Sequence, residues 1–525
     1  MTKPTRRSFL KTAAVVGSAV GSAALLASET NAQQRQGGRR AQGQGTPTTP
    51  AGPRLNVACI GIGGKGDSDA NNAARFGNIV AICDVDRGRL EGKARQEAFQ
   101  TAKQYTDFRE LLTENENNID MVVISGPDHM HGAAALMAMR MGKHCFIQKP
   151  LTRTIYEARI ITDVAKETGV CTQMGNQGTA IDNSRNAIDL MKAGIIGTIT
   201  EVIAWSNRPV WPQRPNRRET MASFAERGYR ESPNRQLADR SIWRQFEDVN
   251  RDLQNLDWRN WISVAPYRDY FPGLYHAFNW RGWWDFGSGA LGDMACHMLT
   301  VPYAAADLKD PTWVRARSSG HDFDSYPAAS VIEFEFPATA DRGKIPFWWY
   351  DRRGNTPPAE IFAKYGITGE LSPSGVLIIG EKGAMFSTDD YCENRRFLQE
   401  GGQQINEDAG QWGEVKANTL YAEKPEGGND VWNMYELYRA IWANDPSIAQ
   451  SNVVDRAGPL TETILLGNLA VWAAAEGGDD GALGEWGEKI EWDAKNLVVT
   501  NLADLKTPGV ADLVKPVFSD GYRLD

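Results

Sequence analysis

Cysteine is scarce in this sequence, and the spacing of the few cysteines supports none of the usual cysteine-based sites. Only six occur among 525 residues, and no two form a Cys-x-x-Cys pair, so neither a zinc motif nor a redox dithiol is indicated. Four of them lie in or beside runs that we predict to be buried strands, where cysteine acts as a small apolar side chain and stays reduced. The six are Cys59, Cys83, Cys145, Cys171, Cys296 and Cys392.

Long basic runs and long apolar runs are also absent. The formal net charge is −9, and no run of Lys and Arg follows the N-terminus, so we expect no nucleic-acid or anionic-membrane partner. The weakly apolar stretch 13–27 is short and rich in Gly, Ser and Ala, so we expect no stable membrane insertion. With 42% apolar residues, the chain can form two good-sized cores.

An export pattern is present at the N-terminus. Arg6 and Arg7 lie in the run Thr-Arg-Arg-Ser-Phe-Leu-Lys, which matches a twin-arginine signal. We predict a signal peptide over 1–32, a disordered linker over 33–53, and a periplasmic or otherwise exported protein. The alternative is a chance arginine pair before an apolar anchor. Twin-arginine export generally moves folded proteins, so a cofactor working outside the cytoplasm should be tightly held and recycled in place.

Apolar runs alternate with amphipathic stretches from about residue 55 to 205, which indicates a parallel sheet covered by helices on both faces. The predicted strands are Leu55–Ile60, Ile79–Cys83, Met121–Ser125, His144–Ile147 and Val170–Met174. The predicted helices are Lys65–Phe76, Arg87–Phe99, Phe108–Glu114, His131–Met141, Ile155–Thr168 and Asn183–Ala193. We therefore expect an α/β domain over 54–175.

The pattern changes near Gly197. A strand is predicted over Thr198–Ser206, and residues 207–285 are dense in Arg, Trp and Pro. A structureless loop of that length is unusual unless it is functional, so we interpret it as an insertion packed beside the active site. Strands over Ser330–Phe336, Phe347–Tyr350 and Val376–Ile379 and helices over Asp430–Asn444 and Leu460–Ala475 complete the prediction. We expect residues 176–525 to form an α+β domain with an open, largely antiparallel sheet.

A glycine-rich motif, Gly61-Ile62-Gly63-Gly64-Lys65-Gly66, directly follows the first predicted strand and opens a helix. Gly61 permits a tight turn, Gly63 lets the backbone approach a pyrophosphate, and Gly66 allows close helix–strand packing. The helix N-terminus supplies amide donors for phosphates. We predict that Gly61, Gly63, Gly64 and Gly66 bind a dinucleotide in a Rossmann domain.

Asp84 follows the second predicted strand, where a carboxylate can accept hydrogen bonds from the adenosine ribose hydroxyls. The same charge would repel a 2′-phosphate, so NAD is favoured over NADP. Arg87, shortly after it, leaves NADP as the alternative.

Two further clusters follow strand ends, where ligands bind in such sheets. In Gly126-Pro127-Asp128-His129-Met130-His131, Pro127 fixes a turn and is predicted to contact the cofactor. His131 either touches the nicotinamide side or only caps the next helix. In Gln148-Lys149-Pro150, Lys149 is predicted to point into the cleft between the domains. Partial burial there would lower its pKa and suit it to proton transfer. Pro150 would fix the backbone, with a cis peptide as one option.

Asp293 and His297 are four residues apart in a helix that follows a Gly-rich turn, so they share one helix face. A carboxylate beside an imidazole raises its pKa and orients its tautomer. His297 is then a candidate base for a hydroxyl proton as hydride leaves the same carbon; a purely structural helix pair is the alternative. No further His or Cys lies at ligand spacing, so we predict no metal.

Tryptophan is abundant, with 17 in the chain. We predict that some stack on sugar rings, with Trp283, Trp284 and Arg281 as substrate contacts; core packing, or salt bridging for Arg281, is the alternative. The candidate stacking platforms are Trp205, Trp211, Trp280, Trp283 and Trp284.

Taken in order, these motifs resemble the glucose–fructose oxidoreductase / inositol dehydrogenase / rhizopine-catabolism (Gfo/Idh/MocA) family over roughly residues 55–475. The resemblance implies a Rossmann domain, an α+β domain whose open sheet often supports homo-oligomers, and a sugar, inositol or related polyol substrate. It also implies catalytic positions at Lys149, Asp293 and His297. The markers are Gly61-x-Gly63-x-x-Gly66, Asp84, Pro127-Asp128-His129-x-His131, Lys149-Pro150 and Asp293-x-x-x-His297.

This chain departs from the family pattern at two places. Gln148 stands where the family usually has Glu, which puts the tuning of Lys149 in question, and the long Trp/Arg-rich insertion resembles that of exported bacterial members. Three functions stay open. The chain could pass hydride from a sugar carbinol to bound NAD and on to a second acceptor. It could be a redox-neutral glycosidase or lyase that oxidises its substrate transiently. It could also be a non-catalytic sugar-binding scaffold, which the retained catalytic positions argue against.

Overall fold

The computed structural model describes residues 52–211, 252–270, 274–352, 354–418, 424–478, 481–516 and 518. The predicted signal peptide and nearly all of the predicted linker lie outside these residues. Residues 212–251 of the predicted insertion lie outside them as well.

The N-terminal domain is built on a six-stranded parallel sheet in the order β3-β2-β1-β4-β5-β6, which confirms the predicted Rossmann architecture. Strand β3 was not predicted, because its residues Lys-Gln-Tyr are polar and mostly exposed and form no apolar run. The strands are β1 Asn56–Ile60, β2 Asn78–Cys83, β3 Lys103–Tyr105, β4 Met121–Ile124, β5 His144–Ile147 and β6 Thr172–Met174.

The helices of this domain follow the predicted pattern closely. Helix α6 is well marked because Thr154 and Glu157 form a capping box and Gly169 closes the helix in the left-handed conformation. Helix α5 begins three residues earlier than predicted, directly after Pro127, which is extended at its N-cap. The helices are α2 Lys65–Phe76, α3 Arg87–Ala94, η1 Glu97–Phe99, α4 Phe108–Glu114, α5 Asp128–Arg140, α6 Ile155–Thr168 and α7 Asp182–Lys192.

The C-terminal half contains a nine-stranded sheet in the order β13-β12-β11-β7-β10-β9-β8-β14-β15. All neighbouring strands are antiparallel except β7 and β10, which confirms the predicted largely antiparallel sheet. The strands are β7 Ile199–Ser206, β8 Trp313–Ser318, β9 Ser330–Phe336, β10 Ile345–Asp351, β11 Gly375–Gly380, β12 Gly383–Ser387, β13 Arg395–Leu398, β14 Ile490–Asp493 and β15 Val498–Val499.

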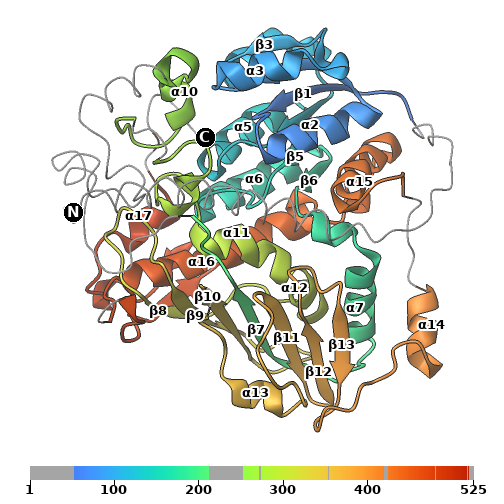
Figure 1. The fold of residues 1–525 in the computed structure, drawn as a ribbon, viewed down its shortest axis with the longest axis vertical. Helices are drawn as coiled ribbons and strands as arrows, with labels where there is room; N and C mark the ends of the chain where they lie inside the picture. The colour runs from blue at the N-terminus through green and yellow to red at the C-terminus, as the bar shows by residue number, and fades with distance from the viewer. Residues whose placement is uncertain are drawn as a thin grey trace, which may run out of the picture. The chain divides into compact units, whose positions relative to one another are not determined.

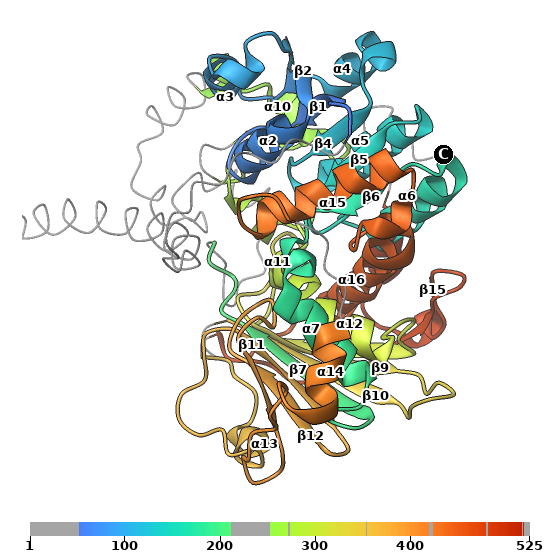
Figure 2. The ribbon, with the colours of Figure 1, turned by 90° about the vertical axis from the view of Figure 1, so that its right-hand side faces the viewer.

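Helices pack on one face of the large sheet and connect it to the Rossmann domain. Helix α11 (Gly289–Met298) contacts β7 and β10, and the almost wholly buried helix α16 (Gly458–Ala473) contacts α6, α11 and β8. Figures 1 and 2 show α11 and α12 (Thr300–Ala306) between the two sheets, while α13 (Ala359–Ala363) lies on the other side of the large sheet. Helix α11 therefore presents its residues at the junction of the two domains.

One helix of the C-terminal half completes the Rossmann domain. Helix α15 (Asn429–Ala443) packs Met434 and Leu437 into the same apolar cluster as Val57 of β1. The hydroxyl of Tyr438 donates a 2.9 Å hydrogen bond to the carbonyl oxygen of Ala73 in α2. The apolar layer over the nucleotide-binding sheet therefore includes residues from more than 350 positions further along the chain.

The described part of the insertion packs on the carboxyl edge of the Rossmann sheet. Helix α10 (Trp258–Ile262) follows Asp257, whose amide donates a 2.8 Å hydrogen bond to the carbonyl oxygen of Val85. The side-chain amide of Asn260 donates a 3.3 Å hydrogen bond to the carbonyl oxygen of Thr106. The described part of the insertion therefore lies beside the residues that follow β2 and β3.

The cysteines agree with the sequence-based expectation. All six cysteines are buried and none forms a disulfide. In the part of the chain that the structure describes, no helix is both long enough and apolar enough to cross a membrane.

Candidate active site

The glycine-rich loop is packed so tightly that only glycine fits at two of its positions. A Cβ on Gly66 would lie 2.0 Å from the carbonyl oxygen of Gly61, and a Cβ on Gly61 would lie 2.6 Å from the amide nitrogen of Gly126. Gly64 has a φ of +57°, and nothing lies within 4 Å of its would-be Cβ. The loop backbone is therefore open on one side and close-packed on the other, as a pyrophosphate cradle requires. The residues present fit a dinucleotide.

Asp84 holds this loop against the end of β2. Its carboxylate accepts 2.9 Å hydrogen bonds from the backbone amides of Ile62 and Asp86, and burial raises the pKa of Asp84 despite these bonds. Arg87 is exposed. Arg89 instead lies beside the loop: a Cβ on Gly63 would meet its guanidinium. The ribose contact of Asp84 stays a prediction, and Arg89 is a neighbour that the sequence reasoning missed.

A buried polar network joins the glycine loop to the Lys149 turn. The carboxylate of Asp69 accepts 2.8 Å hydrogen bonds from Ser125 Oγ and Gln148 Nε2, and Lys65 Nζ lies 3.1 Å from its other oxygen. Lys65 also pairs with Asp430 of α15 at 2.7 Å. The sequence reasoning missed Asp69, although its place on the buried face of α2, beside Gly66, Ala70 and Ala73, was a usable signal.

His131 bridges the two turns that border the site. Its Nδ1 lies 3.0 Å from the carbonyl oxygen of Pro150, and its Nε2 lies 2.8 Å from the carbonyl oxygen of Gly126. The ring is 1% exposed, so this geometry favours the structural alternative, with His131 positioning the two turns. The predicted nicotinamide contacts of Pro127 and His131 stay predictions. The Lys149–Pro150 peptide is cis, as one predicted option had it.

Lys149 and Asp293 meet across the junction of the two domains. Lys149 Nζ lies 2.9 Å from Asp293 Oδ1 and donates a 2.5 Å hydrogen bond to the backbone carbonyl oxygen of Asp293. The two side chains are 17% and 12% exposed, so both still border open space. Lys149 therefore lies at the junction of the two domains, and its predicted position in a cleft stays a prediction.

Two arginines complete the surroundings of Asp293. Arg208 Nε lies 3.3 Å from Oδ2, and Arg281 Nε lies 3.5 Å from Oδ1. Burial alone would raise the pKa of Asp293, but Lys149, Arg281 and Arg208 together hold it well below its usual range. Asp293 is therefore an ionised carboxylate. The substrate contact predicted for Arg281 stays a prediction, and Arg208 was missed because it lies in the predicted insertion without a local motif.

His297 is oriented by an asparagine and not by Asp293, which corrects the prediction. Its Nδ1 lies 2.8 Å from Asn176 Oδ1. The amide group of Asn176 has a fixed orientation, because its Nδ2 donates to the carbonyl oxygen of Cys296 and to Thr300 Oγ1. Nδ1 of His297 must therefore carry the proton, and Nε2 keeps its lone pair.

The pKa of His297 shifts in the direction opposite to the predicted one. Burial and the nearby charge of Lys149 lower it well below 6.5, and Asp293 offsets only part of this. The carboxylate of Asp293 is engaged by Lys149, Arg208 and Arg281. His297 is therefore a neutral imidazole, which is the form a general base requires.

Two further residues border the pair Asp293 and His297. The ring of Tyr391, from the segment after β12, lies 5.1 Å from the ring of His297 in an edge-on arrangement. Asp128, in the first turn of α5, accepts a 2.6 Å hydrogen bond from Ser288 Oγ. Burial raises the pKa of Asp128 to about 7, against the opposing effects of Ser288, Arg281 and Lys149.

The predicted stacking tryptophans are core residues, which corrects that part of the prediction. All five are between 1% and 6% exposed. Trp205 donates its indole N–H to the carbonyl oxygen of Ser372. Trp283 donates to that of Leu274, and Trp284 stacks on Tyr326 at 3.7 Å. Large aromatic faces of this kind gain more from packing against each other than a cleft wall would provide. These indoles form part of the cores that hold the site.

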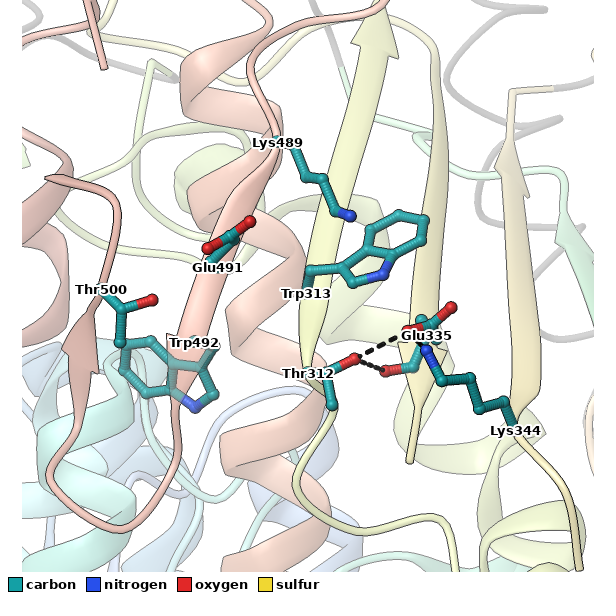
Figure 3. Close-up of a pocket in the computed structure, with 8 residues that line it drawn as sticks. All are labelled: Thr312, Trp313, Glu335, Lys344, Lys489, Glu491, Trp492 and Thr500. Atoms are coloured by element: carbon teal, nitrogen blue, oxygen red, sulfur yellow. Dashed lines mark hydrogen bonds and ion pairs between the residues drawn. The ribbon is translucent and has the colours of Figure 1, made fainter. Parts of the chain in front are cut away.

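A surface hollow of about 480 Å³ lies near the β15 end of the nine-stranded sheet, beside β8 and β14. Figure 3 shows Trp313 and Trp492 in its wall with Lys489 above the Trp313 ring, whose centroid lies 4.1 Å from Lys489 Nζ. It contains none of the predicted site residues. In the described residues, no group of three or more His, Cys, Asp or Glu side chains could hold a metal ion.

Comparison with known proteins gives two profile matches and partial relatives. The profile described as an oxidoreductase family, NAD-binding Rossmann fold (Gfo/Idh/MocA), matches residues 55–176, and the profile of the family's C-terminal alpha/beta domain matches residues 242–338. A glycosyl hydrolase family 109 protein of Shewanella pealeana is 28% identical over 207 residues, covering 38% of this chain and 44% of that protein. The scyllo-inositol 2-dehydrogenase (NAD(+)) of Bacillus subtilis is 32% identical over 125 residues, covering 23% and 35%. The chain spans less than half the length of these relatives.

A solved structure shares the fold along nearly its whole length. The inositol dehydrogenase homolog of Azotobacter vinelandii, complexed with NADH and myo-inositol, is 16% identical with a TM-score of 0.52, and covers 85% of this chain and 99% of that one. At this identity the likeness shows the fold alone. The two profile matches, this fold and the glycine loop with its packed cradle agree with one another. Residues 55–176 and 242–338 of the chain thus match the two domains of the Gfo/Idh/MocA family of NAD-binding oxidoreductases.

Proposed function

We propose that this protein is an NAD-dependent oxidoreductase that acts on a carbinol group of a sugar or polyol. The observation that carries the proposal is the contact of Lys149 with Asp293 in the cleft, one helical turn from the neutral His297. The glycine loop, which would hold a dinucleotide, is joined to the Lys149 turn by the network around Asp69.

Each polar group has a chemical role that follows from its position. Nε2 of His297 keeps a lone pair and accepts the hydroxyl proton of the substrate. The ammonium of Lys149 donates a hydrogen bond to the same oxygen while Asp293 holds it in place. A bound nicotinamide supplies the hydride acceptor. Asn176 keeps the His297 ring in the tautomer that makes this transfer feasible.

Carboxylates near the adenosine end support NAD over NADP. Asp84 and Asp86 both follow β2, and Asp86 caps α3 by accepting from the amides of Gly88 and Arg89. Because a 2′-phosphate would meet these two carboxylates, the site favours the unphosphorylated dinucleotide.

A redox-neutral glycosidase is the second candidate, and one observation favours it. Several relatives, including that of Shewanella pealeana, are named as glycosyl hydrolase family 109 proteins. Transient oxidation followed by elimination would use the same Lys149, Asp293 and His297. Net release of a free sugar from a glycoside, with no added electron acceptor and no accumulation of NADH, would distinguish this activity from a dehydrogenase.

Export and assembly are also part of the proposal. The Arg6-Arg7 pattern supports twin-arginine export to the periplasm, and the open nine-stranded sheet supports a homo-oligomer. Free nucleotide is scarce outside the cytoplasm, so the cofactor would be retained through many turnovers.

The decisive measurement is the absorbance and mass spectrum of the supernatant after denaturing freshly purified protein with no added nucleotide. Stoichiometric NAD(H) is expected. An empty supernatant, together with no binding in a subsequent NAD titration, would contradict the proposed function. Binding of added NAD without retained NAD would contradict only the retention.

A further inference from the structure

The cleft beside Asp293 holds more cationic groups than this carboxylate can satisfy. Lys149 and Arg281 lie 2.9 and 3.5 Å from Oδ1, and Arg208 lies 3.3 Å from Oδ2. Three cationic side chains therefore share the one carboxylate of Asp293. An ionised carboxylate forms its best geometry with a single bidentate guanidinium, so here each arginine is engaged through Nε alone.

The two arginines are fixed on one side and free on the other. The guanidinium of Arg281 lies 4.4 Å from the ring centroids of both Phe278 and Trp280, and its Nη1 donates to the carbonyl oxygen of Phe278. Nη1 of Arg208 donates to Asn207 Oδ1. No hydrogen bond joins either Nη2 atom to another described residue, and the side chains are 26% and 24% exposed. These contacts therefore fix the orientation of both guanidinium groups and leave Nη2 of each without a hydrogen-bond partner among the described residues.

Two other carboxyl groups lie near these cations without pairing with them. Asp128 is bonded to Ser288, and burial raises its pKa to about 7. Burial also raises the pKa of Asp390, although Arg208 opposes that shift. Within the described residues neither carboxyl forms an ion pair with Arg208 or Arg281. Among the described residues, no carboxyl other than Asp293 thus pairs with the two arginines, and their Nη2 groups can serve a ligand.

We propose that the substrate carries an anionic group, a carboxylate or a sulfate ester, and that Arg208 and Arg281 bind it beside Lys149. This inference rests on the proposed function, because it names the substrate class of the same site. Guanidinium groups match the planar array of oxygens in such anions. A sugar with only hydroxyl groups would leave Arg208 and Arg281 sharing the charge of Asp293 with Lys149 when it displaces water from around them.

The test compares charged sugars with neutral analogues of the same shape, using isothermal titration of the full protein with NAD present. The carboxylate arm uses D-glucuronate and D-galacturonate against D-glucuronamide, and the sulfate arm uses glucose 6-sulfate against glucose. We expect an acid to bind at least about 10-fold more tightly than its neutral analogue. A preference in one arm alone identifies the anion. Equal affinities in both arms, or no binding of any acid, overturn the inference.

Variants assign the effect to the two arginines. Arg208→Gln and Arg281→Gln should each weaken binding of the preferred acid by about 10- to 100-fold and change binding of its neutral analogue by less than about 3-fold. Arg315→Gln, which breaks an ion pair between Arg315 on β8 and Glu333 on β9, is the matched control and should change neither. Equal losses for acid and neutral analogue would overturn the assignment.

The same protein tests the proposed function separately. Bound NAD(H) and NADH absorbance during turnover report on the function, whereas the ratio of acid to neutral affinity reports only on the anion site. Oxidation of neutral sugars with no acid preference would keep the function and overturn this inference. Preferential binding of acids by a protein that binds no NAD would support the anion site and contradict the proposed function.

Discussion

The side-chain amide of Gln148 donates a 2.8 Å hydrogen bond to the buried carboxylate of Asp69. This contact explains why glutamine stands where the family pattern has glutamate. A glutamate here would place a second carboxylate against Asp69, whose pKa is already raised by burial. The amide of Gln148 is directed at Asp69 and not at the ammonium of Lys149, which Asp293 holds instead.

Gln148→Glu should therefore destabilise the protein. We expect a loss on the order of 3 kcal/mol in the free energy of unfolding, because a buried charge is left without its donor. Calorimetric melting temperatures measure it. The double variant Asp69→Asn, Gln148→Glu exchanges donor and acceptor and should recover most of the loss. A single variant that melts like the wild type would contradict the role given to this contact.

Gly66→Ala should abolish NAD binding. The new Cβ would lie 2.0 Å from the carbonyl oxygen of Gly61, so the loop must move, at a cost of about 1–3 kcal/mol or more. Gly92→Ala in α3 is the matched control, because nothing lies within 4 Å of its would-be Cβ. That control should bind NAD normally and gain about 0.5–1 kcal/mol of stability. Titration with NAD tests both, and wild-type affinity in Gly66→Ala would exclude the loop as the cradle.

His297→Ala should lower kcat by about 10²- to 10⁴-fold while nucleotide content is unchanged. Its pKa is lowered by burial and by Lys149, so the neutral base form is present at every pH above that lowered pKa. The pH profile of kcat/KM should therefore show no acidic limb near 6.5 that belongs to His297. Unchanged turnover in the variant would remove His297 from the mechanism.

Asp128→Asn should change how stability depends on pH. Burial raises the pKa of Asp128 from 3.8 to about 7, so the folded state binds this proton more tightly than the unfolded state. Its contribution is full below pH about 4 and is lost as the pH rises to about 7. The difference between wild type and variant should fall by on the order of 3–4 kcal/mol across this window.

Melting temperatures of wild type and Asp128→Asn between pH 4 and pH 8 measure this difference. Asp341→Asn, on an exposed loop, controls for the loss of one negative charge. If the melting temperatures of wild type and Asp128→Asn change in parallel with pH, the carboxyl of Asp128 titrates normally in the folded wild-type protein.

Local pattern was sufficient for most of the Rossmann domain. Apolar runs bounded by glycines located β1, β2, β4 and β5, and helices α2, α4 and α6 begin and end at the predicted residues. Strand β8 also carried a usable signal, since Val314 and Ala316 alternate with the outward Trp313 and Arg315. Strands β3 and β15 had none, because they are short and partly polar and form only where a neighbouring strand supplies their partners.

The role of each site residue depended on contacts that no local pattern contains. Spacing placed Asp293 and His297 on one helix face, but the shift in the pKa of His297 follows from burial and Lys149, and its tautomer follows from Asn176. The number of tryptophans suggested sugar stacking. In the structure, Trp283 and Trp284 are instead buried in two different apolar cores.

The sequence by itself determined the Rossmann order of strands and helices, the glycine cradle and the presence of Lys149, Asp293 and His297. These features depend on backbone conformation and residue spacing, which are local properties. Only the tertiary structure decided which charges meet: Arg208 and Arg281 reach Asp293, Gln148 reaches Asp69, and α15 returns to cover the nucleotide-binding sheet. The physical reason is that burial and electrostatic pairing act through space between residues far apart in the chain. The direction of each pKa shift is therefore fixed only once the two domains have packed.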